Sequence, residues 1–453
     1  MQPQNETMTF KRSIENELER WANDKYRKPL VLRGARQVGK TTIVNRFACK
    51  YENYLSVNLE KSEAVKLFES TDDVKSLLPL LFLYCNVQRR EGRTLLFIDE
   101  IQNSPHTVSL LRYFYEEIPN IHVIAAGSLL ETILDKPVSL PVGRVQYMAL
   151  HPCSFLEFLN ATGEERFIEP VRDATLPEVF HSRMNELFRR YSLIGGMPEA
   201  IARYTSEKDF TVLDKVYNTL LNAYKGDMEK YAKNNTQLSV IRYILDEGWA
   251  FSGETVTLGG FGGSSYKSRE TGEAFRMLEK AMLLELVYPL TSALMPMMSD
   301  LKKAPKLFWF DAGLVNYAAN IRKEYVTSGD LTDTWRGKAA EQIVAQELKA
   351  LSTDVGAKRN FWARAKRGST AEVDLVYFFD GNIIPIEVKS GHNAHLKSIH
   401  QFMDETTHDI AVRVWSGKYS IDEVKTQGNK TFRLINLPFY MISALPAILK
   451  KQC

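Results

Sequence analysis

The 453-residue sequence has few cysteines, no strong excess of charge of either sign and no long apolar run. Its four cysteines lie far apart, which argues against a zinc site and a disulfide framework and fits the reducing cytoplasm. The first thirty residues contain no apolar core, so we expect no signal peptide. The most apolar stretches are too short or are interrupted by proline, whereas a membrane-spanning helix needs about 20 apolar residues. We therefore expect a cytoplasmic protein without a membrane partner.

The bulk composition leaves most functional classes open. Apolar residues make up 44% and charged residues 25%, as in folded globular proteins. The net charge of +3 neither requires nor excludes a nucleic-acid partner, so any basic footprint must be local. A chain of this length exceeds one ordinary core, and we expect roughly two to four domains.

The first third of the sequence alternates short apolar runs with amphipathic stretches. This pattern predicts an α/β fold with a parallel sheet that is covered on both faces. The predicted strands are Pro29–Arg33, Tyr54–Asn58, Leu95–Ile98 and His122–Ala126. The predicted helices are Thr41–Lys50, Asp73–Gln88 and Pro105–Glu117.

The rest of the chain changes character twice. Residues 152–231 have a helical pattern, and residues 232–325 follow the order helix, glycine-rich loop, helix, strand, which is the outline of a winged helix. The expected elements from there on are helices at Leu238–Glu247, Lys267–Met282 and Ala339–Leu351 and strands at Leu283–Tyr288, Asn360–Ala365, Ala371–Phe378 and Ile383–Val388. The predicted domains are therefore 1–151, 152–231, 232–325 and 331–453.

Residues 34–41 match the phosphate-binding template G-x-x-x-x-G-K-[ST] at every fixed position. They lie between a predicted strand and a predicted helix, where backbone N–H groups can face the phosphates of a nucleotide. The predicted ATP-binding residues are Gly34, Ala35, Arg36, Gln37, Val38, Gly39, Lys40 and Thr41. We expect Lys40 to contact the β- and γ-phosphates and to act in catalysis, and Thr41 to bind Mg²⁺.

A second motif follows about sixty residues later, where the apolar run Leu95–Ile98 ends in two carboxylates. Asp99 at the end of a buried strand is expected to hold the Mg²⁺ ion. Glu100 is then positioned to orient or deprotonate the attacking water.

Two further residues each have two interpretations. Ser128 follows an apolar strand and would either sense the γ-phosphate or cap the next helix. Arg144 lies in a glycine turn and would be either an arginine finger or a solvated arginine.

Several motifs together resemble the uncharacterised bacterial and archaeal AAA-type ATPases that share a C-terminal domain of unknown function. They are Arg33–Thr42, Phe97–Gln102, Gly143–Arg144, His151–Phe158, Gly195–Glu199 and Trp309–Leu314. The resemblance extends the nucleotide-binding segment to Thr42. It implies an ATPase core with an additional strand between the two motif strands, a helical lid, a winged helix and a nuclease-like C-terminal part.

A second candidate site lies in residues 331–453. Ala371–Asp374 and Pro385–Lys389 resemble the PD-(D/E)XK nuclease core, although Val373 replaces the proline of its first motif. Glu387 and Lys389 lie two apart on a predicted strand and so share one face. Asp374 on the neighbouring strand and Glu341 on the preceding helix would complete a restriction-endonuclease-like site for Mg²⁺ or Mn²⁺. The alternative is an ordinary exposed Glu-x-Lys pair on a strand.

Basic residues near this segment favour DNA or RNA as a partner. Residues 331–453 carry 17 Lys and Arg against 13 Asp and Glu. Lys358, Arg359, Arg364, Lys366 and Arg367 cluster around Phe361 and Trp362. Such a mixture suits a nucleic-acid backbone, but a solvated hairpin explains it equally well.

Three functions remain in competition. The first is a Mg²⁺-dependent ATPase that controls a nucleic-acid-directed, nuclease-like domain. The second is a nucleotide-dependent switch or assembly protein with an inactive nuclease fold, which would act on a protein partner or on other copies of itself. The third is a DNA-binding regulator that uses the winged helix, where Arg269 and Arg276 would contact the duplex.

Overall fold

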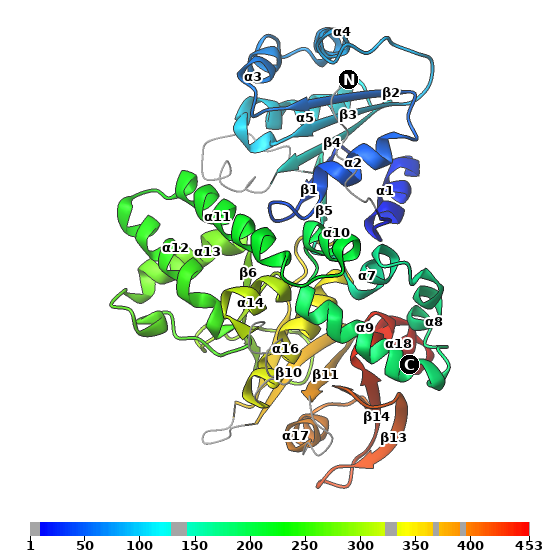
Figure 1. Cartoon of the computed structure of the whole chain (residues 1–453), viewed down its shortest axis with the longest axis vertical. Coiled ribbons are helices and arrows are strands. Elements are labelled where there is room, and N and C mark those ends of the chain that lie inside the picture. Colours follow the sequence, from blue (N-terminus) through cyan, green and yellow to red (C-terminus); the bar gives the residue numbers. More distant parts are fainter. Residues whose placement is uncertain (1–9, 128–142, 322–332, 366–370, 390–395, 453) are drawn as a thin grey trace. The chain divides into compact units, whose positions relative to one another are not determined.

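The computed structural model describes residues 10–127, 143–321, 333–365, 371–389 and 396–452 (Figure 1). The contacts divide the chain into two compact units. Unit 1 contains Met1–His151, Lys280–Met282 and Ser352–Gly356. Unit 2 contains Pro152–Glu279, Leu283–Leu351 and Ala357–Cys453. No helix in the described ranges is both long and apolar enough to cross a membrane.

Unit 1 is built on a five-stranded parallel sheet in the order β2-β3-β4-β1-β5. The strands are β1 (Leu30–Arg33), β2 (Asn53–Asn58), β3 (Thr94–Asp99), β4 (Ile121–Gly127) and β5 (Gln146–Ala149). Every residue of β1, β3 and β4 is buried, whereas burial alternates along the edge strand β2. This confirms the predicted α/β class, and β4 is the additional strand between β1 and β3 that the resemblance implied.

In the described part of unit 1, five helices accompany this sheet: α1 (Ile14–Asn23), α2 (Lys40–Ala48), α3 (Ser62–Glu69), α4 (Val74–Tyr84) and α5 (Pro105–Glu117). Side chains of α3, α4 and α5 share one apolar core with alternate residues of the strands. The Asp73 side chain accepts hydrogen bonds from the first turn of α4, and Ser104 caps α5 in the same way. These caps fix the start of each helix close to the predicted position.

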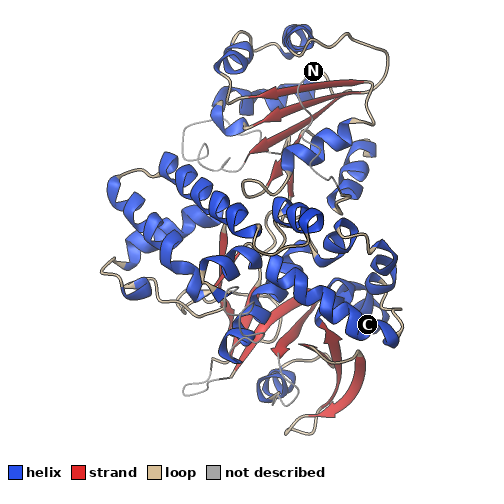
Figure 2. Ribbon diagram, in the orientation of Figure 1, coloured by secondary structure: helices blue, strands red, loops and turns tan. Residues whose placement is uncertain are grey.

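The first part of unit 2 is helical, as Figure 2 shows. It contains α7 (Phe155–Ala161), α8 (Ile168–Arg172), α9 (His181–Ile194), α10 (Pro198–Glu207), α11 (Leu213–Tyr231), α12 (Asn235–Glu247) and α13 (Ser268–Lys280). The strands β6 (Leu284–Val287) and β8 (Lys306–Trp309) follow and pair antiparallel. The order helix, loop, helix, strand is therefore present, and its designation as a winged helix remains a prediction.

Two glycine motifs of unit 2 meet at the end of α9. A Cβ atom on Gly195 would lie 2.4 Å from the backbone N of Gly313, and one on Gly313 would lie 2.1 Å from the Ile194 carbonyl oxygen. The buried Asp311 carboxylate accepts hydrogen bonds from Gly196 N at 2.6 Å and from Leu314 N at 2.9 Å, and so it caps α14 (Ala312–Ala318). Only glycine allows this backbone contact.

A seven-stranded mixed sheet forms the second part of unit 2, in the order β13-β14-β12-β11-β10-β9-β7. Its strands are β7 (Pro289–Leu290), β9 (Asn360–Ala363), β10 (Glu372–Phe379), β11 (Asn382–Lys389), β12 (Ile410–Trp415), β13 (Ser420–Lys425) and β14 (Thr431–Pro438). The helices α16 (Asp333–Ala350), α17 (Lys397–Glu405) and α18 (Leu445–Gln452) accompany it. Consecutive strands β9, β10 and β11 pair antiparallel, whereas β11 and β12 pair parallel.

Candidate functional site

The loop between β1 and α2 has the backbone of a phosphate-binding loop. Gln37 and Gly39 take left-handed conformations, with φ of 63° and 98°. A Cβ atom on Gly34 would lie 2.5 Å from the Leu150 carbonyl oxygen, so this position requires glycine. The loop leads directly into the first turn of α2, whose N–H groups form the positive end of the helix dipole.

Lys40 at the start of α2 is buried in this loop. Its Nζ atom donates hydrogen bonds to the carbonyl oxygens of Gly34 and Ala35, both at 2.9 Å. Phosphate oxygens are stronger acceptors than these neutral carbonyls. The ammonium group is thus already held inside the loop where a nucleotide phosphate would compete for it.

Thr41 joins the two nucleotide-binding motifs. Its Oγ1 atom donates a 2.8 Å hydrogen bond to Oδ2 of Asp99 at the end of β3. A hydroxyl and a carboxylate at this separation are both oxygen ligands of the kind Mg²⁺ prefers. Thr41 and the adjacent Thr42 are exposed, so a nucleotide could reach this edge of the loop.

Glu100 stands next to this pair in a left-handed conformation with φ of 53°. Its own N–H bonds Oδ1 of Asp99 at 3.1 Å, and its side chain accepts a hydrogen bond from Gln102. Burial raises the pKa of Glu100 above its ordinary value. A carboxylate held in this way can accept a proton more readily than a solvated one.

Sequence reasoning missed Gln102. Its Nε2 atom bonds Glu100, and its Oε1 atom would lie 2.3 Å from a Cβ atom added to Gly127 at the end of β4. Within the described part of the chain, Oε1 is buried without a hydrogen-bond partner. The residue was visible in the second motif, but a glutamine two positions after a carboxylate suggested no role.

Sequence reasoning also missed Arg12, whose side chain is hydrogen-bonded to the backbone of the loop. The Arg12 guanidinium donates to the carbonyl oxygens of Val38 at 3.2 Å and His151 at 2.8 Å. Val38 belongs to the phosphate-binding loop itself. No local motif surrounds Arg12, so no sequence signal connected it to the site.

The predictions for Arg144 and Ser128 in unit 1 stay open. The Arg144 side chain is 46% exposed, and its Nε atom bonds Oε1 of Glu116 on α5 at 3.1 Å. A role as an arginine finger remains a prediction. Ser128 lies outside the described residues.

The predicted residues of the second site come from three elements that meet. Glu341 lies on α16, Asp374 on β10, and Glu387 and Lys389 on β11. Lys389 Nζ pairs with Oε1 of Glu387 at 2.7 Å, and Oδ2 of Asp374 accepts a 2.8 Å hydrogen bond from Val388 N. We call Glu341, Glu372, Asp374 and Glu387 the carboxylate cluster.

An unpredicted lysine occupies the carboxylate cluster. Lys306 on β8 is only 3% exposed. Its Nζ atom lies 2.8 Å from Oε1 of Glu372, 3.2 Å from Oε2 of Glu341 and 3.8 Å from Oδ1 of Asp374. Among the described residues, no three His, Cys, Asp or Glu side chains are arranged to hold a metal ion. The predicted metal ligands therefore converge without forming a ready-made metal site.

The protonation of the carboxylate cluster reflects its burial. Burial raises the pKa of Glu341 to about 7 and that of Glu387 to about 8, and the charge of Asp374 adds to both shifts. Burial opposes the charged form of Lys306, but Glu341, Asp374 and Glu372 more than offset it and raise the Lys306 pKa above its usual value. The Lys306 ammonium group thus stays charged, whereas burial favours the protonated forms of Glu341 and Glu387.

The basic and aromatic segment before β10 is described only in part, and its two aromatic residues do not face solvent. Phe361 and Trp362 are buried in the core and cannot stack on bases. The Arg359 guanidinium pairs with Glu285 at 3.0 Å, and Arg364 pairs with Glu405 at 2.6 Å. Lys366 and Arg367 lie outside the described residues. Consecutive aromatic residues here serve packing.

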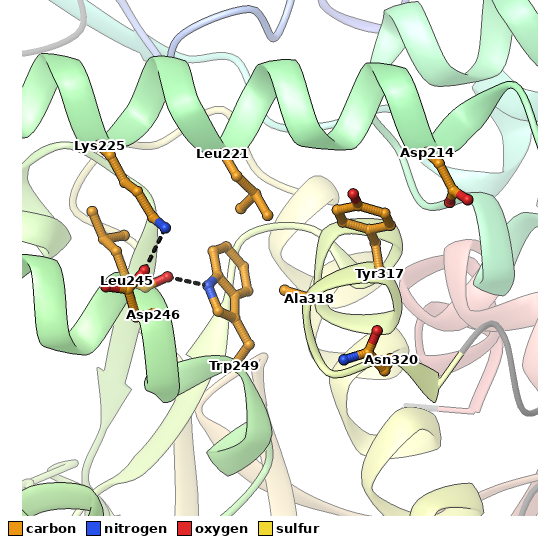
Figure 3. Close-up of a pocket in the computed structure, with 9 residues that line it drawn as sticks. All are labelled: Asp214, Leu221, Lys225, Leu245, Asp246, Trp249, Tyr317, Ala318 and Asn320. Carbon is orange, nitrogen blue, oxygen red and sulfur yellow. Dashed lines mark hydrogen bonds and ion pairs between the residues drawn. The ribbon is translucent and has the colours of Figure 1, made fainter.

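A cavity of about 260 Å³ opens among α11, α12 and α14 (Figure 3). Trp249 and Tyr317 form its aromatic wall, and Lys225 pairs with Asp246 at its edge. The indole N–H of Trp249 donates to the Leu245 carbonyl oxygen at 2.7 Å.

Comparison with known families divides the chain in three. Residues 26–159 match a family model described as an AAA domain. Residues 185–325 and 336–440 match two domains of unknown function, DUF8612 and DUF4143. A search of curated proteins found no match.

Solved structures of low similarity include the three proteins described next. A Walker-type ATPase of Pyrococcus abyssi is 16% identical over 69% of this chain and 96% of its own, with a TM-score of 0.43. The Orc1 protein of Aeropyrum pernix, solved with DNA, is 10% identical over 72% of this chain and 96% of its own, with a TM-score of 0.30.

The third, a signal transduction ATPase of Pyrococcus horikoshii with a tetratricopeptide repeat sensor, is 12% identical over 76% of this chain and 45% of its own, with a TM-score of 0.29. Values this low carry no functional argument. The chain therefore contains an AAA-type P-loop ATPase domain in its N-terminal third, followed by two regions that match domains of unknown function.

Proposed function

We propose that the protein is a Mg²⁺-dependent ATPase that hydrolyses ATP on the loop between β1 and α2. The observation that carries this proposal is the 2.8 Å hydrogen bond from Thr41 to Asp99, which brings the two motifs to one point. The N-terminal end of α2 would face the phosphates, and Lys40 would exchange its two loop carbonyls for phosphate oxygens. Bound Mg²⁺ would neutralise phosphate charge there.

Glu100 is the proposed base of this reaction. It lies directly after Asp99, it is half-buried, and Gln102 fixes one of its oxygens. Glu100 would orient the attacking water and accept its proton, and Gln102 would hold the Glu100 carboxylate in place. General-base catalysis contributes about 10²- to 10⁴-fold to such reactions.

The test is steady-state ATP hydrolysis combined with nucleotide binding. We expect Lys40→Ala to lose both, and Glu100→Gln to bind ATP while its turnover falls by about 100-fold or more. Lys50→Ala is the matched control, because Lys50 follows α2 but pairs with Glu19 on the surface. An unchanged rate of ATP hydrolysis in Lys40→Ala would refute the proposal.

For unit 2 we propose a helical lid at 152–231, a winged-helix-like segment at 232–325 and a nuclease-like domain at 331–453. The order α12, loop, α13, β6 and the β6–β8 pairing support the winged helix. Arg269 on α13 pairs with Glu273 at 3.1 Å, and this mixed charge favours a protein partner over DNA for that helix.

A second candidate function is metal-dependent cleavage of DNA or RNA by the nuclease-like domain. It is favoured by the convergence of Glu341, Asp374 and Glu387 with Lys389 beside them. Cleavage of labelled DNA and RNA with Mg²⁺ or Mn²⁺, with and without ATP, would vanish in Glu387→Ala if this site acts. Absence of any cleavage, with ATP hydrolysis intact, would favour a nucleotide-dependent switch that acts through a protein partner or an oligomer.

A further inference from the structure

The carboxylate cluster gathers acidic side chains in a buried place. Glu341, Asp374 and Glu387 are largely or wholly buried, on three different elements. Removing charged groups from water is costly unless an opposite charge lies beside them. A cluster of this kind therefore needs a cation, and oxygen-rich sites commonly take Mg²⁺ or Mn²⁺.

The protein supplies a cation of its own. Lys306 extends from β8 into the carboxylate cluster, and its Nζ atom lies between 2.8 and 3.8 Å from oxygens of Glu372, Glu341 and Asp374. Its Nζ atom also lies over the ring of Phe361, 5.2 Å from the ring centroid. An ammonium group this deeply buried and this close to three carboxylates stands where a metal ion would bind.

One oxygen of the carboxylate cluster is left over. Glu387 is only 5% exposed, and its Oε1 atom pairs with Lys389 at 2.7 Å. Its Oε2 atom is buried and has no hydrogen-bond partner within the described ranges. An unpaired buried carboxylate oxygen beside other acidic residues is a free ligand position.

We propose that the Lys306 ammonium is the resident cation of the carboxylate cluster and that it excludes a divalent metal while it remains there. The inference rests on the metal ligands of the proposed nuclease-like site and adds the residue that regulates access to them. Without Lys306, the remaining lysine that pairs with the carboxylate cluster among the described residues is Lys389, which contacts Glu387. The cluster would then take one Mn²⁺ or Mg²⁺ ion, with Glu387 Oε2 among its ligands.

The test is Mn²⁺ binding to the full-length, nucleotide-free protein, followed by electron paramagnetic resonance. All variants carry Asp99→Ala, so that the ATP site does not contribute. Lys306→Met keeps the aliphatic stem and removes the charge. Lys302→Met, in the loop before β8, is the matched control.

In the parent protein with Lys306 intact, and in the Lys302→Met control, we expect no Mn²⁺ binding that depends on Glu387. This should hold for Mn²⁺ concentrations up to about 1 mM, which is the weak end of the affinities of protein cation sites. Lys306→Met should gain one site, at least roughly tenfold tighter, and Lys306→Met with Glu387→Ala should lose it. Mn²⁺ binding that needs Glu387 while Lys306 is present would overturn the inference. So would a folded Lys306→Met protein that binds no Mn²⁺.

A folding defect would also decide the question. If Lys306→Met is unfolded without metal, circular dichroism should show that Mn²⁺ restores its structure, because the ion replaces the lost charge. Failure of Mn²⁺ to restore it would count against the inference. Because binding is the readout, an inactive nuclease site would not affect the result. Loss of cleavage in every variant would therefore refute only the proposed nuclease activity.

Discussion

Glu347 offers a quantitative test of the core of unit 2. This residue of α16 is 2% exposed, and its Oε1 atom accepts hydrogen bonds from Phe155 N at 3.0 Å and the Tyr191 hydroxyl at 2.6 Å. Burial raises the pKa of Glu347 from 4.5 to about 7. The folded protein therefore holds a proton that the unfolded chain releases at a lower pH.

The sign of the pH effect follows from this difference. The contribution of Glu347 to stability is fully present below about pH 4.5 and is lost as the pH rises through about 7. At pH 8 the loss approaches about 3 kcal/mol, because each pKa unit corresponds to about 1.4 kcal/mol. Glu347→Gln keeps an oxygen for both hydrogen bonds but cannot ionise. We expect it to match the parent protein at pH 4 and to exceed it at pH 8.

Thermal unfolding at the two pH values measures this effect. A gain of about 3 kcal/mol corresponds to several degrees in the melting temperature of a domain of this size. Glu247→Gln on α12 is the control, because Glu247 is exposed. An advantage of Glu347→Gln that is equal at both pH values, or a loss at pH 8, would refute the reasoning.

Three further predictions concern other residues. Gly34→Ala should weaken ATP binding in a fluorescent-nucleotide titration, because the new Cβ atom would lie 2.5 Å from the Leu150 carbonyl oxygen. Gln102→Ala should lower ATP turnover and leave ATP binding within a few-fold, which single-turnover measurements would separate. Burial alone would raise the pKa of Glu285, but Arg359 and a neighbouring lysine offset it and hold the pKa at about 2. Its stabilising effect should persist above about pH 4.5 and fade as the pH drops through 2, and Glu285→Gln should lower stability at pH 7 by about 3–5 kcal/mol in thermal unfolding.

The nucleotide-binding loop was predictable because its information is local. Eight consecutive residues define the loop, and a strand and a helix flank them in the sequence. The second motif, which ends in Asp99, lies at the end of the fully buried strand β3, and the apolar run in the sequence predicted that strand. The structure joins Thr41 to Asp99 by a hydrogen bond and holds Lys40 against the carbonyl oxygens of the loop, and the roles of these residues stay predictions.

The second site shows what sequence cannot supply. Glu387 and Lys389 were visible as a spaced pair, but Lys306 lies 81 positions before Glu387 in an unremarkable apolar strand. Its role depends on how β8 is placed beside α16 and β10, which no local pattern encodes. Phe361 and Trp362 show the opposite problem. Their basic neighbours predicted an exposed nucleic-acid-binding surface, but the fold buries both rings.

The contact between Gly195 and Gly313 has a consequence for reading genetic data on this protein. Any side chain at either position would collide with backbone, and Gly196 is in the same situation, because its Cβ would lie 2.4 Å from the Cys153 carbonyl oxygen. A saturation mutagenesis screen should therefore find these glycines as intolerant as Lys40. Such a screen alone would rank these glycines with the residues proposed to bind ATP, although they act only by allowing two segments of the backbone to pack in contact. Rescue of the glycine variants at low temperature, but not of Lys40→Ala, would distinguish the two kinds of intolerance.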